Sequence, residues 1–202
     1  MYVMNRSSSV AFDPIPSDLR DLVYELWDRH ASAQFPLAYL ITFTCYGTRL
    51  HGDPRGSVDD EHNVWGSPPL PPCYNRVQAH LGRLRHAPYL LDKPRRRIVL
   101  GAIKEVCRFR KWILLAAHVR TTHAHAVVHA YCDPTFILNS FKAYSTRGLN
   151  RAFGRWPENK WAEKGSKRYL WKPENVLERI RYVLFLQGEP METYFATEQE
   201  FR

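Results

Sequence analysis

Two apolar segments joined by a very short connection constrain the fold of this chain more than any other feature. Residues 112–119 and 123–131 are mostly apolar, and Thr121 and Thr122 supply a tight connection between them. Two strands joined by so few residues pair with each other in antiparallel directions, because a parallel pair requires a long crossover. The sequence therefore predicts a β-hairpin over 112–131.

The segments on both sides of this hairpin alternate between strand and helix patterns. Apolar residues recur at helical spacing over 95–110, 134–153 and 175–187. Segment 39–46 is β-branched and aromatic, which predicts a strand, and a further short strand is expected at 169–171. The order strand, helix, strand, strand, helix, strand, helix is typical of an α+β, ferredoxin-like fold. In that fold an antiparallel sheet has its helices packed on one face.

We expect one domain with additions at both ends, since 202 residues suit a single core. Residues 1–36 predict an N-terminal arm with a short amphipathic helix, and 191–202 predict a C-terminal tail. The domain itself would cover 37–190, with a loop insertion at 51–75 that is rich in Gly, Pro, Asp and Asn.

The charge balance favours a polyanionic partner. Lys and Arg number 29 against 20 acidic residues, which gives a net charge of +9. A basic excess of this size is typical of nucleic-acid-binding proteins. The four cysteines form no CxxC pair, so we expect free thiols in a reducing cytoplasm rather than disulfides or a zinc ribbon. No segment reaches the roughly 20 apolar residues that a membrane span requires.

His123 and His125 are the candidate metal ligands. They are two residues apart in a predicted strand, so their side chains project from the same face of the sheet. Two neighbouring imidazoles can hold a divalent metal ion, although an isolated HxH pattern more often has no metal. His129 has the same parity but lies about 13 Å farther along the strand, too far to share an ion with the pair.

Three segments resemble the motifs of one enzyme family. Residues 116–131 read AAHVRTTHAHAVVHAY, residues 141–150 read FKAYSTRGLN, and residues 173–190 read PENVLERIRYVLFLQGEP. Together they resemble the single-tyrosine HUH transposases, which include the REP-associated tyrosine transposases and their insertion-sequence relatives. These have a His–hydrophobic–His strand, a basic helix and a C-terminal helix that carries a tyrosine. The resemblance covers roughly residues 38–190.

The resemblance implies an active site and a reaction. Tyr182 would be the nucleophile, and His123 and His125 would bind a divalent cation, Mg²⁺ or Mn²⁺. The reaction would nick and rejoin single-stranded DNA through a covalent phosphotyrosine on the 5′ side, leaving a free 3′-OH. A cation would polarise the phosphate oxygens, and basic neighbours would favour the phenolate of a tyrosine that is otherwise a weak nucleophile.

The third metal ligand and the nucleophile each have an alternative. We expect Gln187 as the third ligand, but five residues along a regular α-helix would turn it away from Tyr182 unless the last turn is distorted. Glu178, one turn before Tyr182, is the other candidate for that position. Tyr144 is the rival nucleophile, because it also lies on a basic helix. Its ordinary interpretation is a packed aromatic residue, and we prefer Tyr182.

The expected partner is single-stranded DNA, and the expected sites are the hairpin-bearing ends of a repeat or mobile element. The predicted DNA-binding residues are basic and lie on the last two helices: Lys142, Arg147, Arg151, Arg179 and Arg181. Segment 151–172 interleaves cations with aromatic residues, which suits single strands. Two other functions stay open, a non-catalytic DNA-binding protein and a metal-dependent hydrolase that uses water. Family members act as monomers or as homodimers in the prokaryotic cytoplasm, where we expect association with the nucleoid.

Overall fold

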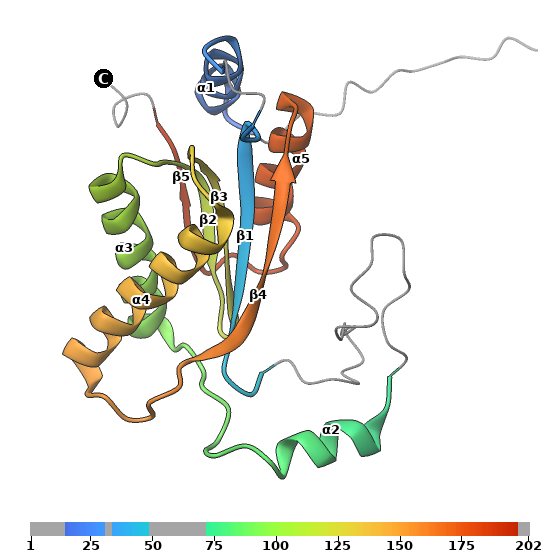
Figure 1. Cartoon of the computed structure of the whole chain (residues 1–202), viewed down its shortest axis with the longest axis vertical. Coiled ribbons are helices and arrows are strands. Elements are labelled where there is room, and N and C mark those ends of the chain that lie inside the picture. The colour runs from blue at the N-terminus through green and yellow to red at the C-terminus, as the bar shows by residue number, and fades with distance from the viewer. Residues whose placement is uncertain (1–14, 31–33, 49–71, 198–202) are drawn as a thin grey trace, which may run out of the picture.

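The computed structural model describes residues 15–30, 34–48 and 72–197, and it places a five-stranded sheet between two layers of helices (Figure 1). The predicted loop insertion at 51–75 falls largely outside these residues. The strands are β1 (Ala38–Cys45), β2 (Ile113–Val119), β3 (His123–His129), β4 (Trp161–Leu170) and β5 (Glu192–Phe195). The helices are α1 (Ser17–Asp28), α2 (Tyr74–Leu81), α3 (Lys93–Arg110), α4 (Pro134–Phe153) and α5 (Pro173–Phe185).

The sheet has the order β4-β1-β3-β2-β5, and every neighbouring pair is antiparallel. Its first four strands, with α3 between β1 and β2 and α4 between β3 and β4, form the ferredoxin-like arrangement that the order of elements predicted. The predicted hairpin is confirmed as β2 and β3. Its connection is hydrogen-bonded to β1 and to the segment before α3, because the carbonyl of Thr122 accepts the N–H of Cys45 and that of Thr121 accepts the N–H of Leu91.

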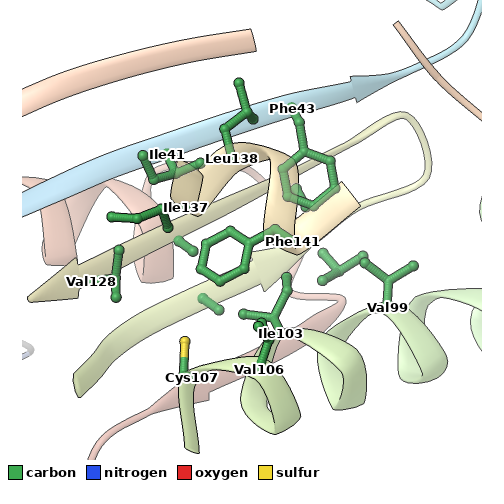
Figure 2. Close-up of a cluster of buried hydrophobic side chains, with 14 of the residues drawn as sticks. Ile41, Phe43, Val99, Ile103, Val106, Cys107, Val128, Ile137, Leu138 and Phe141 are labelled. Atoms are coloured by element: carbon green, nitrogen blue, oxygen red, sulfur yellow. The ribbon is translucent and has the colours of Figure 1, made fainter. Parts of the chain in front are cut away.

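One face of the sheet packs against α3 and α4. Alternate residues of β1 and β3 point into this layer, among them Ile41, Phe43 and Val128. Figure 2 shows them meeting Ile103 of α3 and Phe141 of α4 in one apolar cluster. The period of two along each strand sends the remaining side chains to the opposite face.

The opposite face is covered by α5, and α1 packs against α5 in turn (Figure 1). Val176, Ile180 and Val183 of α5 are buried together with Leu19 and Val23 of α1. The prediction of helices on one face therefore holds for α3 and α4, the helices of the ferredoxin-like core. The C-terminal helix forms a separate layer because its own apolar stripe needs a second surface to bury it.

Three elements differ from the sequence-based expectation. Strand β4 covers ten residues rather than the three predicted. Most of its residues are polar and exposed, so they form no apolar pattern by which the sequence could reveal the strand. The expected C-terminal tail contains β5, which pairs with β2 over four residues. Helix α2 has no buried residue, so the sequence has no helical period of apolar residues there that would predict it. No helix in the described part of the chain is long and apolar enough to cross a membrane.

Candidate active site

Two strands place alternating polar residues opposite each other on the α5 face. Thr42 of β1 is the register partner of His125 in β3, and Thr44 is the partner of His123. Cross-strand partners on one face have their Cβ atoms about 5 Å apart, so the four side chains form a compact polar group. A pocket of about 130 Å³ opens over this group. It is lined by Thr44, Thr48, Thr122, His123, His125, Tyr182 and Gln187.

Threonine hydroxyls orient both imidazoles. Nδ1 of His125 lies 2.7 Å from Oγ1 of Thr42, and Nδ1 of His123 lies 3.0 Å from Oγ1 of Thr122. The two rings are 4.7 Å apart between centroids. Histidines that bind metal ions usually have one ring nitrogen held by such a partner, which fixes the ring and directs the other nitrogen at the ion. The threonines were missed in the sequence, although the TFT of β1 has the same period of two as the HAH of β3.

Tyr182 reaches this pocket from α5. Its ring lies 5.5 Å from the ring of His125, measured between centroids. The helix is anchored on the sheet by Ile180 and Val183, which flank Tyr182 in sequence and are fully buried. The guanidinium of Arg179 lies 5.9 Å from the centre of the Tyr182 ring and also pairs with Glu178 at 2.9 Å. The structure thus brings the predicted nucleophile and both predicted histidines together.

Gln187 joins the same pocket because α5 ends before it. The helix stops at Phe185, Leu186 has φ −107° and ψ 19°, and Gly188 adopts φ 76°. The chain therefore leaves helical geometry at the residue before Gln187 and turns it back toward the histidines. Oε1 of Gln187 accepts a hydrogen bond from Nε2 of His125 at 3.2 Å. Its Nε2 lies 3.4 Å from the carbonyl of Tyr182.

The two alternative residues lie elsewhere. Glu178 is exposed, pairs with Arg179 and does not line the pocket. Tyr144 is on α4, on the other side of the sheet, where its ring packs beside Phe109 and under the guanidinium of Arg147. Its ordinary interpretation as a packed aromatic residue fits this position. Of the competing candidates, Gln187 and Tyr182 are therefore the ones that share a pocket with the histidines.

His118 connects the segments that carry Tyr182 and Gln187. It is fully buried, its Nδ1 donates to the carbonyl of Val183 at 2.9 Å, and its Nε2 accepts the N–H of Met191 at 3.2 Å. Burial lowers its pKa, which favours the neutral ring that these two hydrogen bonds require. His129, in contrast, lies at the far end of β3, where its Nδ1 donates to the carbonyl of Leu37.

The predicted DNA-binding residues lie on two sides of the sheet. Arg179 and Arg181 are on α5, the helix that carries Tyr182, whereas Arg147 and Arg151 are exposed on α4. The ammonium of Lys142, also on α4, donates to the carbonyls of Ala162, Glu163 and Lys164 in β4. These three hydrogen bonds attach α4 to the edge strand.

The donors in the pocket fit a divalent cation. In the described part of the chain no three His, Cys, Asp or Glu side chains form a metal-binding group, so the amide oxygen of Gln187 decides whether a third protein ligand exists. Two neighbouring ligands of an octahedral ion at about 2.1 Å are about 3.0 Å apart. The 3.2 Å between Nε2 of His125 and Oε1 of Gln187 is close to that spacing. An ion would replace the proton that these two atoms share.

Comparison with known proteins gives distant structural similarities. No protein-family model and no curated protein sequence matches the chain. The structure of a REP-associated tyrosine transposase bound to a REP hairpin is similar with a TM-score of 0.44 and 12% identity, over 74% of this chain. The match covers 65% of that protein, slightly less than two thirds of it. A candidate transposase from Deinococcus radiodurans R1 is similar with a TM-score of 0.40 and 12% identity, over 74% of this chain and 91% of that one.

Similarities this distant carry no argument about chemistry, which depends on the residues of the site. By sequence motif and by structural comparison, the chain is similar to REP-associated tyrosine transposases.

Proposed function

We propose that this protein nicks and rejoins single-stranded DNA, with Tyr182 as the nucleophile and a divalent cation, Mn²⁺ or Mg²⁺, held by His123, His125 and Gln187. The observation that carries the proposal is the shared pocket. Residues from β3, α5 and the segment after α5 meet there, although 62 residues separate His125 from Gln187. A tyrosine, two imidazoles and an amide within one small pocket are the groups that phosphoryl transfer to a tyrosine requires.

When bound, a divalent cation would neutralise charge on the scissile phosphate and polarise its oxygens. The chain's own residues prepare the site for it. Thr42 and Thr122 orient the imidazole rings of His125 and His123, and the end of α5 at Phe185 directs Gln187 into the pocket. Two imidazoles and one amide leave the remaining ligand positions to phosphate oxygens and water, which is typical of sites for phosphoryl chemistry.

Tyr182 would supply the attacking oxygen. A bond forms between its Oη and phosphorus, the bond from phosphorus to the 3′ oxygen breaks, and the proton lost by the phenol balances the proton gained by the leaving 3′-OH. The guanidinium of Arg179, 5.9 Å from the ring centre, adds positive charge on the same helix that would attract the DNA backbone. Because the phosphotyrosine keeps the energy of the cleaved bond, another 3′-OH can reverse the step. Rejoining of this kind serves transposition of a repeat or mobile element.

The test is covalent capture of DNA. Hairpin-bearing single strands labelled at the 3′ end, which stays on the segment bound to the tyrosine, are incubated with Mn²⁺ or Mg²⁺ and resolved on a denaturing gel. We expect an adduct for the native chain, none for Tyr182→Phe, and an undiminished adduct for Tyr144→Phe, the matched control on the other face of the sheet. His123→Ala and His125→Ala should also abolish the adduct while leaving the fold intact.

Other outcomes distinguish the competing functions. Binding without cleavage in all proteins would indicate a non-catalytic DNA-binding protein. Cleavage without a covalent product would indicate a hydrolase that uses water. A DNA-linked peptide that contains Tyr144 would place the nucleophile on α4 and contradict the proposal.

A further inference from the structure

We infer that Trp156, supported by His86 and Tyr46, forms a stacking site for an unpaired base of single-stranded DNA. That the bound polymer is single-stranded DNA rests on the proposed function, but the stacking site is formed by residues outside the candidate active site. Trp156 follows α4, His86 lies in the segment before α3, and Tyr46 follows β1. None of the three lines the pocket that contains Tyr182.

The three rings form a continuous series that ends at the surface. Tyr46 and His86 have centroids 4.2 Å apart with their planes tilted by 35°, and His86 and Trp156 are 6.0 Å apart in an edge arrangement. Tyr46 and His86 are half-buried, whereas Trp156 is 75% exposed. Nε2 of His86 is buried without a hydrogen-bond partner among the described residues, an unmet polar group of the kind that often marks a functional position.

The segment that presents Trp156 is held firmly from below. Lys160 is only 2% exposed, and its ammonium donates to the carbonyls of Arg155 and Pro157 on either side of Trp156. The carbonyl of Lys160 in turn accepts the N–H of Tyr46. A buried lysine is costly, and here it fixes a loop whose tryptophan faces solvent instead of the core. A large aromatic ring held rigidly at the surface is characteristic of a recognition site rather than of a packing residue.

The positive charges around the rings favour a nucleic acid over a protein as the partner. Arg155 precedes Trp156, and Arg83 and Arg85 lie within three residues of His86; all three are exposed. The backbone N–H of Arg85 donates to the hydroxyl of Tyr46 at 2.9 Å, which keeps this segment against the ring series. Within three residues of Trp156 and of His86, Glu158 is the one acidic side chain. Cations around an exposed aromatic ring are the combination that binds a phosphate backbone while a base stacks on the ring.

The site lies at the end of the sheet where the pocket opens. The C-terminal end of β1, the start of β3 and the start of β4 meet there, as the pairing of Thr44 with His123 and of Cys45 with Trp161 shows. Tyr46 is two residues before Thr48, which lines the pocket. A DNA strand with its scissile phosphate in the pocket would therefore pass over this end of the sheet, where a base next to that phosphate can reach Trp156.

The experiment compares binding of two probes of equal length, an oligothymidylate and an abasic deoxyribose-phosphate oligomer. Both carry the same backbone charge, so only stacking distinguishes them. We expect Trp156→Ala to weaken oligothymidylate binding by about tenfold and to leave abasic binding unchanged. Trp156→Phe should retain part of the difference. Trp27→Ala, which removes an exposed tryptophan of α1, is the matched control and should behave as the native chain.

The outcomes separate this inference from the proposed function. If Trp156→Ala binds both probes as the native chain does, the stacking site is refuted, whether or not Tyr182 forms an adduct. If the native chain forms no adduct but loses oligothymidylate selectively on Trp156→Ala, the stacking site stands and the nuclease proposal fails. Tighter binding of an oligouridylate than of oligothymidylate would overturn the choice of DNA.

Discussion

Replacement of Thr42 by valine tests whether the histidine pair binds a metal ion. Valine has nearly the same shape as threonine and keeps the β-branch that suits a strand, but it removes the hydroxyl 2.7 Å from Nδ1 of His125. In the free site, Nε2 of His125 donates to the amide oxygen of Gln187, so Nδ1 of the neutral ring accepts a hydrogen bond from the Thr42 hydroxyl. With an ion on Nε2 the proton moves to Nδ1, and the same hydroxyl must act as acceptor.

The magnitude follows from the difference between these two hydrogen bonds. A neutral hydrogen bond contributes about 0.5–1.5 kcal/mol, and one to a charged group contributes about 1.5–3 kcal/mol. The ring becomes partly cationic when it binds an ion, so losing Thr42 costs the bound state about 1–1.5 kcal/mol more than the free state. That difference corresponds to roughly a tenfold rise in the Kd for Mn²⁺, at the lower end of the 10–100-fold effects known for such partners.

Isothermal titration calorimetry with Mn²⁺ measures this change directly and needs no DNA. Thr42→Ser is the matched variant, since it keeps the hydroxyl and should restore most of the native affinity. An unchanged Kd in Thr42→Val, with Mn²⁺ still bound by the native chain, would show that His125 is not a ligand. Absence of Mn²⁺ and Mg²⁺ binding in the native chain would remove the metal site altogether.

Three further predictions concern the fold and the charge of the chain. Gly165→Ala should destabilise the protein by about 1–3 kcal/mol in urea unfolding, because an added Cβ would lie 2.8 Å from the carbonyl of Thr42 and 2.9 Å from Leu138. Gly101→Ala has open space and should instead stabilise α3 by up to about 1 kcal/mol; equal effects at the two positions would contradict this packing. Burial lowers the pKa of His129, so the unfolded chain binds its proton first. The stability that the neutral His129 ring contributes is therefore complete above about pH 6.5 and is lost as the pH falls toward the lowered pKa. The urea midpoint should accordingly fall less steeply with decreasing pH in His129→Leu than in the native chain. Binding to single strands should weaken with salt at a slope of about −0.7 per phosphate contacted, given the +9 charge, and a flat response would show that the charge has another purpose.

The sequence alone determined the ferredoxin-like core and half of the candidate site. The short connection between β2 and β3 permits only a hairpin, and the helical periods of α3 and α4 place these helices between strands. His123 and His125 share a face in any strand, because side chains alternate with a period of two. These inferences succeed because they depend on local geometry, which the order of residues fixes.

The tertiary structure decided which residues complete the site. Regular helix geometry turned Gln187 away from Tyr182, and only the end of α5 at Phe185 brings it to His125. Thr42 meets His125 through the register of β1 and β3, which is set by the burial of whole strands rather than by either residue. Tyr144 and Tyr182 both lie on basic helices, and their surroundings differ because the two helices pack on opposite faces of the sheet. Contacts between distant segments depend on how apolar faces are shared among all the elements, and no local pattern contains that information.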